Sequence, residues 1–280
     1  MLYRRPDDLP KRVQKAPMPD LLVLQLLIAA IVPVVFLLAI EAGYRVGRRR
    51  TSDSKIDTGP IQGAILGLLG LLLAFSFAGS AGRFVERQHL VYEDANAIGT
   101  AVLRADLLPD PYADGLRDTL REYTEHRAQT GSIIRGGELQ AALARVPEYH
   151  NRMWAIARDG VAEAPGSTVV VINAVNDVID THTLRVASNR HLQTPVLGLL
   201  VICSLLTLGI IGFTCGMAGA RNAAMTTVIA LLIASTLLIT LDLDNGRVGL
   251  IRISDAPLEE LSFDRVPSAQ SPAVSPAASD

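Results

Sequence analysis

The sequence predicts an all-α integral membrane protein in which four transmembrane helices carry a cytoplasmic helical domain between the second and third spans. The chain of 280 residues is 49% hydrophobic but only 5% aromatic. Four apolar runs each reach the roughly 20 residues that a helix needs to cross a bilayer. A long segment between the second and third runs combines charged and apolar residues at helical spacing. These observations favour a multi-pass membrane protein over a single soluble globule.

The four predicted spans cover residues 21 to 40, 61 to 82, 195 to 219 and 223 to 241. The first run follows about 20 mostly polar residues and lacks the short basic region and small-residue cleavage site of a signal peptide. We therefore interpret it as a retained anchor. The third and fourth spans are joined by little more than Arg221 and Asn222, which predicts a tight antiparallel hairpin.

The distribution of Lys and Arg predicts the orientation of the spans. With four spans, the N-terminal tail (residues 1 to 20), the segment 83 to 194 and the C-terminal segment (242 to 280) lie on one side. That side carries most of the basic residues near span ends, which places both termini and the inserted domain in the cytoplasm. The triplet Arg48, Arg49 and Arg50 lies on the other side and counts against this orientation.

The sequence predicts four helices in the inserted domain, residues 83 to 194. The first continues the second span without a polar break as far as residue 108, where Pro109 and Pro111 stop it. The others cover residues 112 to 130, 137 to 161 with an interruption at Pro147, and 167 to 191. Polar residues at helical spacing predict a buried hydrogen-bonded network between the first and fourth helices, made by Glu93, Asn96, Thr100, Arg104, Asn176, Asp180 and Arg185. The tail after about residue 262 is rich in Ser, Pro and Ala and is expected to be disordered.

Two spans carry stripes of small residues, which allow helix backbones to approach closely in lipid. The second span has Gly63, Gly67, Gly70, Ala74, Ala78 and Ala81, and the third has Gly209, Gly212, Gly216 and Gly219. The pattern favours packing within one chain over packing between chains.

A polar line follows another side of the second span, through Ser76, Ser80, Arg83 and Arg87. Such a line needs protein or water to face. Two interpretations stay open: the serines bond their own backbone while the arginines are interfacial, or the line borders a water-filled path near its inner mouth.

Carboxylates end the fourth span, where Asp242 and Asp244 precede Arg247. They could cap an ion path or bind Ca²⁺, but the spacing is not that of a calcium loop. An ion pair between an aspartate and an arginine that fixes the helix end to its neighbour is the favoured role.

The sequence contains none of the motifs of a serine hydrolase, P-loop, dinucleotide-binding fold or zinc protease, so we expect no enzyme, catalytic residue or cofactor. Glu86 and His89 have the spacing of a di-iron helix motif, but no second copy exists, and we expect no metal. The net charge of −2 and the absence of recognition motifs argue against a nucleic-acid partner.

Three stretches together resemble the bacterial bestrophin-like domain family: LGLLLAFSFAGSAGRFVERQHLVYEDANAIGTAVLRADLLP, then NDVIDTHTLRVAS, then LDLDNGRVGLIRIS. The family is named for a distant similarity to bestrophins, which are homopentameric anion channels whose second span lines the pore. The motif Arg83, Phe84, Val85, Glu86 is similar to the one that follows the apolar pore constriction there. Counting back from it implies constriction positions at Gly67, Leu71 and Phe75, although Gly67 supplies no side chain.

The resemblance implies a homo-oligomeric, pentameric channel of the bacterial inner membrane that conducts small anions such as chloride. Its partners would be the lipid bilayer, further copies of itself and the ion. It nominates Leu71 and Phe75 as the pore face, whereas the polar line nominates Ser76 and Ser80, roughly a quarter turn or more away. The alternative function is a non-conducting membrane scaffold or sensor whose cytoplasmic helical domain binds a partner.

Overall fold

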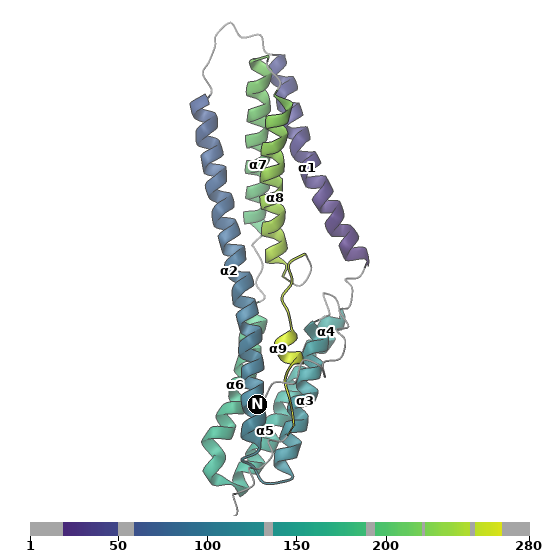
Figure 1. Ribbon diagram of the computed structural model, residues 1–280, viewed down its shortest axis with the longest axis vertical. Coiled ribbons are helices and arrows are strands. Elements are labelled where there is room, and N and C mark those ends of the chain that lie inside the picture. The colour runs from purple at the N-terminus through teal and green to yellow at the C-terminus, as the bar shows by residue number, and fades with distance from the viewer. Residues whose placement is uncertain are drawn as a thin grey trace, which may run out of the picture. The chain divides into compact units, whose positions relative to one another are not determined.

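The computed structural model describes residues 19–49, 59–131, 137–188, 194–219, 222–246 and 250–264. Within these ranges every regular element is a helix (Figure 1). The chain divides into two compact units. One contains Val13–Leu90 and Arg185–Ser254, and the other contains Val91–Leu184 and the segment that begins at Asp255. Helix α2 runs through the boundary at residue 90 as one continuous element.

The first unit holds four helices long and apolar enough to cross a membrane, as predicted. They are α1 (Pro19–Arg48), α2 (Gly59–Ala105), α7 (Thr194–Met217) and α8 (Ala223–Asp244). Helix α1 continues about two turns beyond the predicted end of its span. Those turns carry an ion pair one turn apart, between Arg45 Nε and Glu41 Oε1 at 2.9 Å, which helps to keep a partly charged helix end helical.

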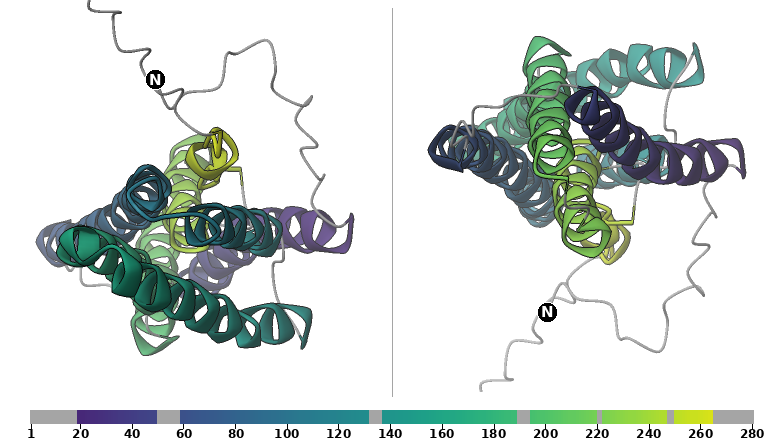
Figure 2. Two further views of the ribbon diagram at one scale, coloured as in Figure 1. Left: turned by 90° about the horizontal axis from the view of Figure 1, so that it is seen from below. Right: turned by 90° about the horizontal axis from the view of Figure 1, so that it is seen from above.

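Helices α1, α7 and α8 pack side by side, as Figures 1 and 2 show. Glycines interlock α1 with α7 so closely that a methyl group added at Gly43, Gly47, Gly212 or Gly216 would collide with the backbone of the other helix. The stripe on the third span therefore packs within the chain, as the sequence favoured. The facing glycines of α1 were not recognised in the sequence as part of this contact.

The core of this unit draws on all four helices. Its fully or nearly buried side chains include Phe36 of α1, Leu69 and Leu73 of α2, Leu208 of α7 and Leu237 of α8. Helix α8 begins at Ala223, and the side chain of Asn222 before it accepts a hydrogen bond from the backbone N–H of Met225 at 3.2 Å. This cap satisfies one of the N–H groups that a helix start leaves unpaired.

The second unit contains the last turns of α2 and the helices α3 (Tyr112–Gly131), α4 (Gly137–Ala144), α5 (Val146–Glu163), α6 (Thr168–Ala187) and α9 (Ala256–Glu259), with a 3₁₀ turn at Pro165–Ser167. Its core includes Ile98 of α2, Leu120 of α3, Met153 of α5 and Val175 of α6, all fully buried. The break between α4 and α5 falls at Arg145 rather than at Pro147, because Pro147 occupies the first turn of α5, where its missing N–H costs no helical hydrogen bond.

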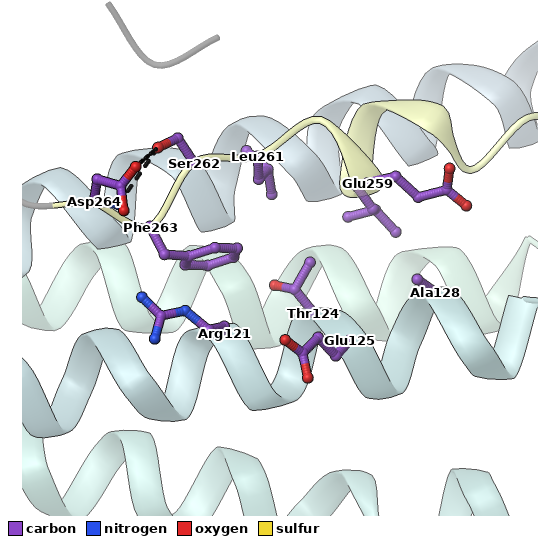
Figure 3. Close-up of a pocket in the computed structure, with 10 residues that line it drawn as sticks. Arg121, Thr124, Glu125, Ala128, Glu259, Leu261, Ser262, Phe263 and Asp264 are labelled. Carbon is purple, nitrogen blue, oxygen red and sulfur yellow. Dashed lines mark hydrogen bonds between the residues drawn. The ribbon is translucent and has the colours of Figure 1, made fainter. Parts of the chain in front are cut away.

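The chain that follows α9 lies along α3. There the ring of Phe263 faces the guanidinium of Arg121 at 5.7 Å, beside a shallow hollow that Thr124 and Glu125 also line (Figure 3). Leu258 of α9 is fully buried and anchors this segment. The tail expected to be disordered lies, beyond residue 264, outside the described residues.

Candidate functional site on helix α2

Helix α2 presents an apolar face that its own chain leaves exposed. Leu71 is 53% exposed and Phe75 is 68% exposed, and both lie in a helix that is apolar enough to cross a membrane. Gly67, the third constriction position that the resemblance implies, has no described atom within 4 Å of the place where a Cβ would stand. The three predicted constriction positions therefore lie on a surface that the described part of the chain leaves open.

The small-residue stripe of α2 is open in the same way. Gly63, Gly67 and Gly70 meet nothing within 4 Å, and Ala74 and Ala78 are exposed. The described part of the chain thus supplies no helix that packs against these glycines. For α2, unlike α7, the interpretation of the stripe as packing within one chain is wrong, because α1 fills the corresponding position on α7 and not on α2.

The polar line of α2 turns toward helix α8 of the same chain. Ser80 is fully buried and Ser76 is half-buried. Arg83 donates from Nε (3.1 Å) and Nη2 (2.8 Å) to Asp244 Oδ1, and the same Nη2 donates to Ser80 Oγ at 2.8 Å. Arg87, also buried, donates from Nη1 to the backbone carbonyl oxygen of Asp244 at 2.8 Å. Both arginines therefore hold the C-terminal end of α8.

This arrangement, which we call the α2–α8 anchor (Ser80, Arg83, Arg87 and Asp244), has a clear electrostatic basis. The last carbonyl groups of a helix carry partial negative charge, and here the carboxylate of Asp244, the last residue of α8, adds to it. The guanidinium groups of Arg83 and Arg87 compensate the negative charge of these carbonyls and of the carboxylate. The Asp244 side chain is 6% exposed and that of Arg83 is 30% exposed, so the pair is largely shielded from water.

Asp242 has a different role from Asp244. Its Oδ1 accepts from the backbone N–H of Leu250 at 3.1 Å and its Oδ2 from that of Ile251 at 3.0 Å, so it shapes the chain after α8. Arg247, the third residue predicted here, lies outside the described residues. The sequence suggested an ion pair that fixes the end of the fourth span; the arginine in that pair is Arg83, which is 161 positions away in the chain.

Metal chemistry finds no support among the described residues, which contain no group of three or more His, Cys, Asp or Glu able to hold an ion. Glu86 and His89, which have the spacing of a di-iron motif, are both exposed on α2.

The buried hydrogen-bonded network predicted between the first and fourth helices of the inserted domain does not form from the residues named, because Asn96 and Asn176 are exposed. Arg104 does reach α6, where it donates to the carbonyl oxygen of Val170 at 3.1 Å.

The buried network of the second unit uses Asp94 instead, one residue from the predicted Glu93. Asp94 is fully buried and pairs with Arg127 of α3 at 2.8 Å. It follows Arg87 by seven residues, which keeps it on the same side of α2 as the anchor. Sequence inspection could have found it by extending the polar line of the second span two turns further.

Comparisons with known proteins agree with this fold. The family model for the Bestrophin-like domain matches residues 28–258. Crystal structures of a bacterial bestrophin homolog from Klebsiella pneumoniae are similar at 14% sequence identity. One variant has a TM-score of 0.59 and covers 85% of this chain and 94% of its own, and another has a TM-score of 0.55 and covers 90% and 92%. Comparison with curated proteins gives no significant match. The chain is a multi-pass membrane protein of the bestrophin-like domain family, with the bestrophin fold.

Proposed function

We propose that the protein is an anion-selective channel of the bacterial inner membrane, formed by a homo-oligomer, most simply a pentamer, with α2 lining the pore. The main support for this proposal is the exposed apolar face of α2. Phe75 and Leu71 project from the single chain, one turn apart, and the open glycine stripe runs beside them. A stripe that no described residue of its own chain covers is suited to close approach by a helix of a second copy.

The alternative pore face, Ser76 and Ser80 with the arginines, is less suited to border water. Ser80 is fully buried and the arginines hold Asp244. Around the helix, Ser80 stands about 140° from Phe75. We therefore place the pore on the Phe75 side. Because a ring of apolar side chains can close a narrow path by excluding water, Leu71 and Phe75 would form the constriction.

Family membership supports conduction rather than catalysis, and it is the support for anion selectivity. The positive charges of Arg83 and Arg87 contribute less than the sequence suggested, since Asp244 compensates them. The orientation with both termini and the inserted domain in the cytoplasm remains part of the proposal, as do residues 83 to 194 as the bounds of that domain.

The test is the current through the purified protein in a planar bilayer under a KCl gradient, with the subunit number measured on the same sample. We expect reversal near the chloride equilibrium potential. Phe75→Ala should raise the conductance, because it removes the largest exposed side chain of the constriction. Phe77→Ala is the matched control, since Phe77 is the same residue type about 160° around the helix.

The outcomes separate the candidates. A reversal potential near that of potassium would retain the channel and reject anion selectivity. Equal effects of the two phenylalanine variants would reject the assignment of the pore face. An intact oligomer that carries no current would reject the channel and favour a membrane scaffold or sensor whose helical domain binds a partner.

A further inference from the structure

The second unit contains a buried polar cluster that plays no part in the proposed pore. We call it the Asp94 cluster: Asp94 of α2, Tyr123 and Arg127 of α3, His150 of α5, and His182 of α6. Asp94 and Tyr123 are fully buried, and the Arg127 side chain is 6% exposed. Four helices therefore bring titratable groups into one shielded site.

Asp94 is the charge that joins these helices. It accepts from Arg127 Nη2 at 2.8 Å, and Thr181 Oγ1 of α6 lies 3.5 Å from its other oxygen. Burial lowers the pKa of the Arg127 guanidinium, but Tyr123, Asp94 and Asp255 together raise it by more, so the net pKa is above the ordinary value. The Arg127 guanidinium is thus charged at neutral pH, and the hydrogen bond to the Asp94 carboxylate compensates its burial.

The imidazole of His150 lies near the Asp94–Arg127 pair. Its ring packs on Tyr123 (5.6 Å between ring centroids) and against His182 (5.2 Å). The ring nitrogen Nε2 is buried and has no hydrogen-bond partner among the described residues. Burial lowers the pKa of the imidazole, the Arg127 charge lowers it further, and Asp94 opposes this effect. His150 is therefore neutral in the folded protein at neutral pH.

From this geometry we propose that His150 is the proton sensor of the inserted domain, and that its protonation loosens the hold of α3 and α6 on α2. A protonated His150 is a second cation in the site that the Arg127 guanidinium occupies, and Asp94 is the one carboxylate that the cluster offers to both. Sharing that carboxylate weakens its bond to Arg127. The other groups that face the imidazole, Tyr123, Tyr149 and His182, bring no negative charge at neutral or mildly acidic pH.

The direction of the pH effect follows from the proton balance. When the cluster opens, His150 regains its ordinary pKa of about 6.5 and binds a proton more readily than in the closed state. Acidification below that value therefore favours opening, and the effect is complete below the pKa of the closed state. Above pH 6.5 both states are neutral at this residue and stability does not change. Each unit of pKa difference shifts the opening equilibrium about tenfold.

Asp94 lies on the same continuous helix as Leu71 and Phe75, so loosening its contacts acts on the helix that we propose as the pore wall. This part of the inference rests on the proposed function. It predicts that acid on the side of the inserted domain reduces the current.

The first test is direct and needs no current. In the full-length protein labelled at its five histidines, NMR titration should give His150 a midpoint below 6.5. The His150 signal is assigned by its loss in His150→Phe, which keeps a ring against Tyr123, or in His150→Gln if the first variant does not fold. A midpoint at or above 6.5 would overturn the proposal.

The second test is hydrogen exchange of the full-length protein at about pH 7.5 and about pH 5.5, corrected for the intrinsic pH dependence of exchange. We expect acid to increase exchange in α2 around Asp94 and in α3 around Arg127. His150→Phe should lack the increase, whereas His89→Gln, which changes an exposed histidine of α2, should retain it. The same increase in His150→Phe as in the wild type, or its loss in a His182→Phe variant alone, would overturn the assignment to His150.

Current recordings then separate this inference from the proposed function. A wild-type current that falls with acid, together with a His150→Phe current that does not, supports both. Absence of current at every pH, with the NMR midpoint and the exchange response intact, would reject the channel and leave the sensor. A current that falls equally in both proteins would place the pH response elsewhere and reject the coupling.

Discussion

Replacement of Asp244 with alanine should destabilise the membrane unit more than any change of an exposed ion pair. The carboxylate is 6% exposed and receives two hydrogen bonds from Arg83. Removal of one partner of a buried ion pair costs about 3–5 kcal/mol. Arg83 keeps 30% of its side chain exposed, so water recovers part of this loss and we expect about 2–3 kcal/mol. Arg87 binds the backbone carbonyl oxygen, a contact that alanine preserves.

The assay is thermal loss of the monodisperse protein in detergent. An effect of this size corresponds to a fall in Tm of about 5–10 °C. Glu41→Ala is the control, because its partner Arg45 is 71% exposed and such a pair contributes about 0–1 kcal/mol. Asp244→Asn should be intermediate, since an amide oxygen still accepts but carries no charge. An Asp244→Ala shift no larger than that of Glu41→Ala would show that the α2–α8 anchor does not stabilise the protein.

Two further predictions concern packing and the second unit. Gly212→Ala should lower Tm, because its methyl group meets the backbone of α1 at Ile40 and overpacking costs about 1–3 kcal/mol, whereas Gly70→Ala should leave the single chain as stable as the wild type. Equal shifts for the two would refute the interlocking of α1 with α7. Asp94→Ala should cost about 3–5 kcal/mol by leaving Arg127 buried without its carboxylate, measured by hydrogen exchange in α3. Unchanged exchange there would mean that the pair does not hold the unit together.

The positions of the helices could be predicted from the sequence because each depends on local signals. Apolar length marked the four spans, and Pro109 and Pro111 marked the end of the long second helix. Even there, α1 extends beyond the predicted end of its span, since an apolar run indicates which residues lie in the hydrocarbon core of the bilayer and not where the helix ends. Helix α1 continues to Arg48 because its glycines still pack on α7 there.

The use of each helix face could not be predicted in the same way, because it depends on partners that are distant in the sequence. Arg83 and Asp244 were both recognised, but their pairing spans 161 positions, and the sequence offered Arg247 as a nearer candidate. The two small-residue stripes were similar as patterns. What distinguishes them is that α1 covers one and no described helix covers the other.

The two sides of α2 therefore have different surroundings, and we expect them to have different roles. On one side, Arg83 and Arg87 bind the end of α8, and two turns further on Asp94 binds α3. On the other side, Leu71 and Phe75 face away from the chain. Substitutions on the first side should change the stability of the single chain, and those on the second should change assembly or current while the chain stays folded. A proton at His150 acts on the first side only, so its influence on a pore could arise only through displacement of the whole helix.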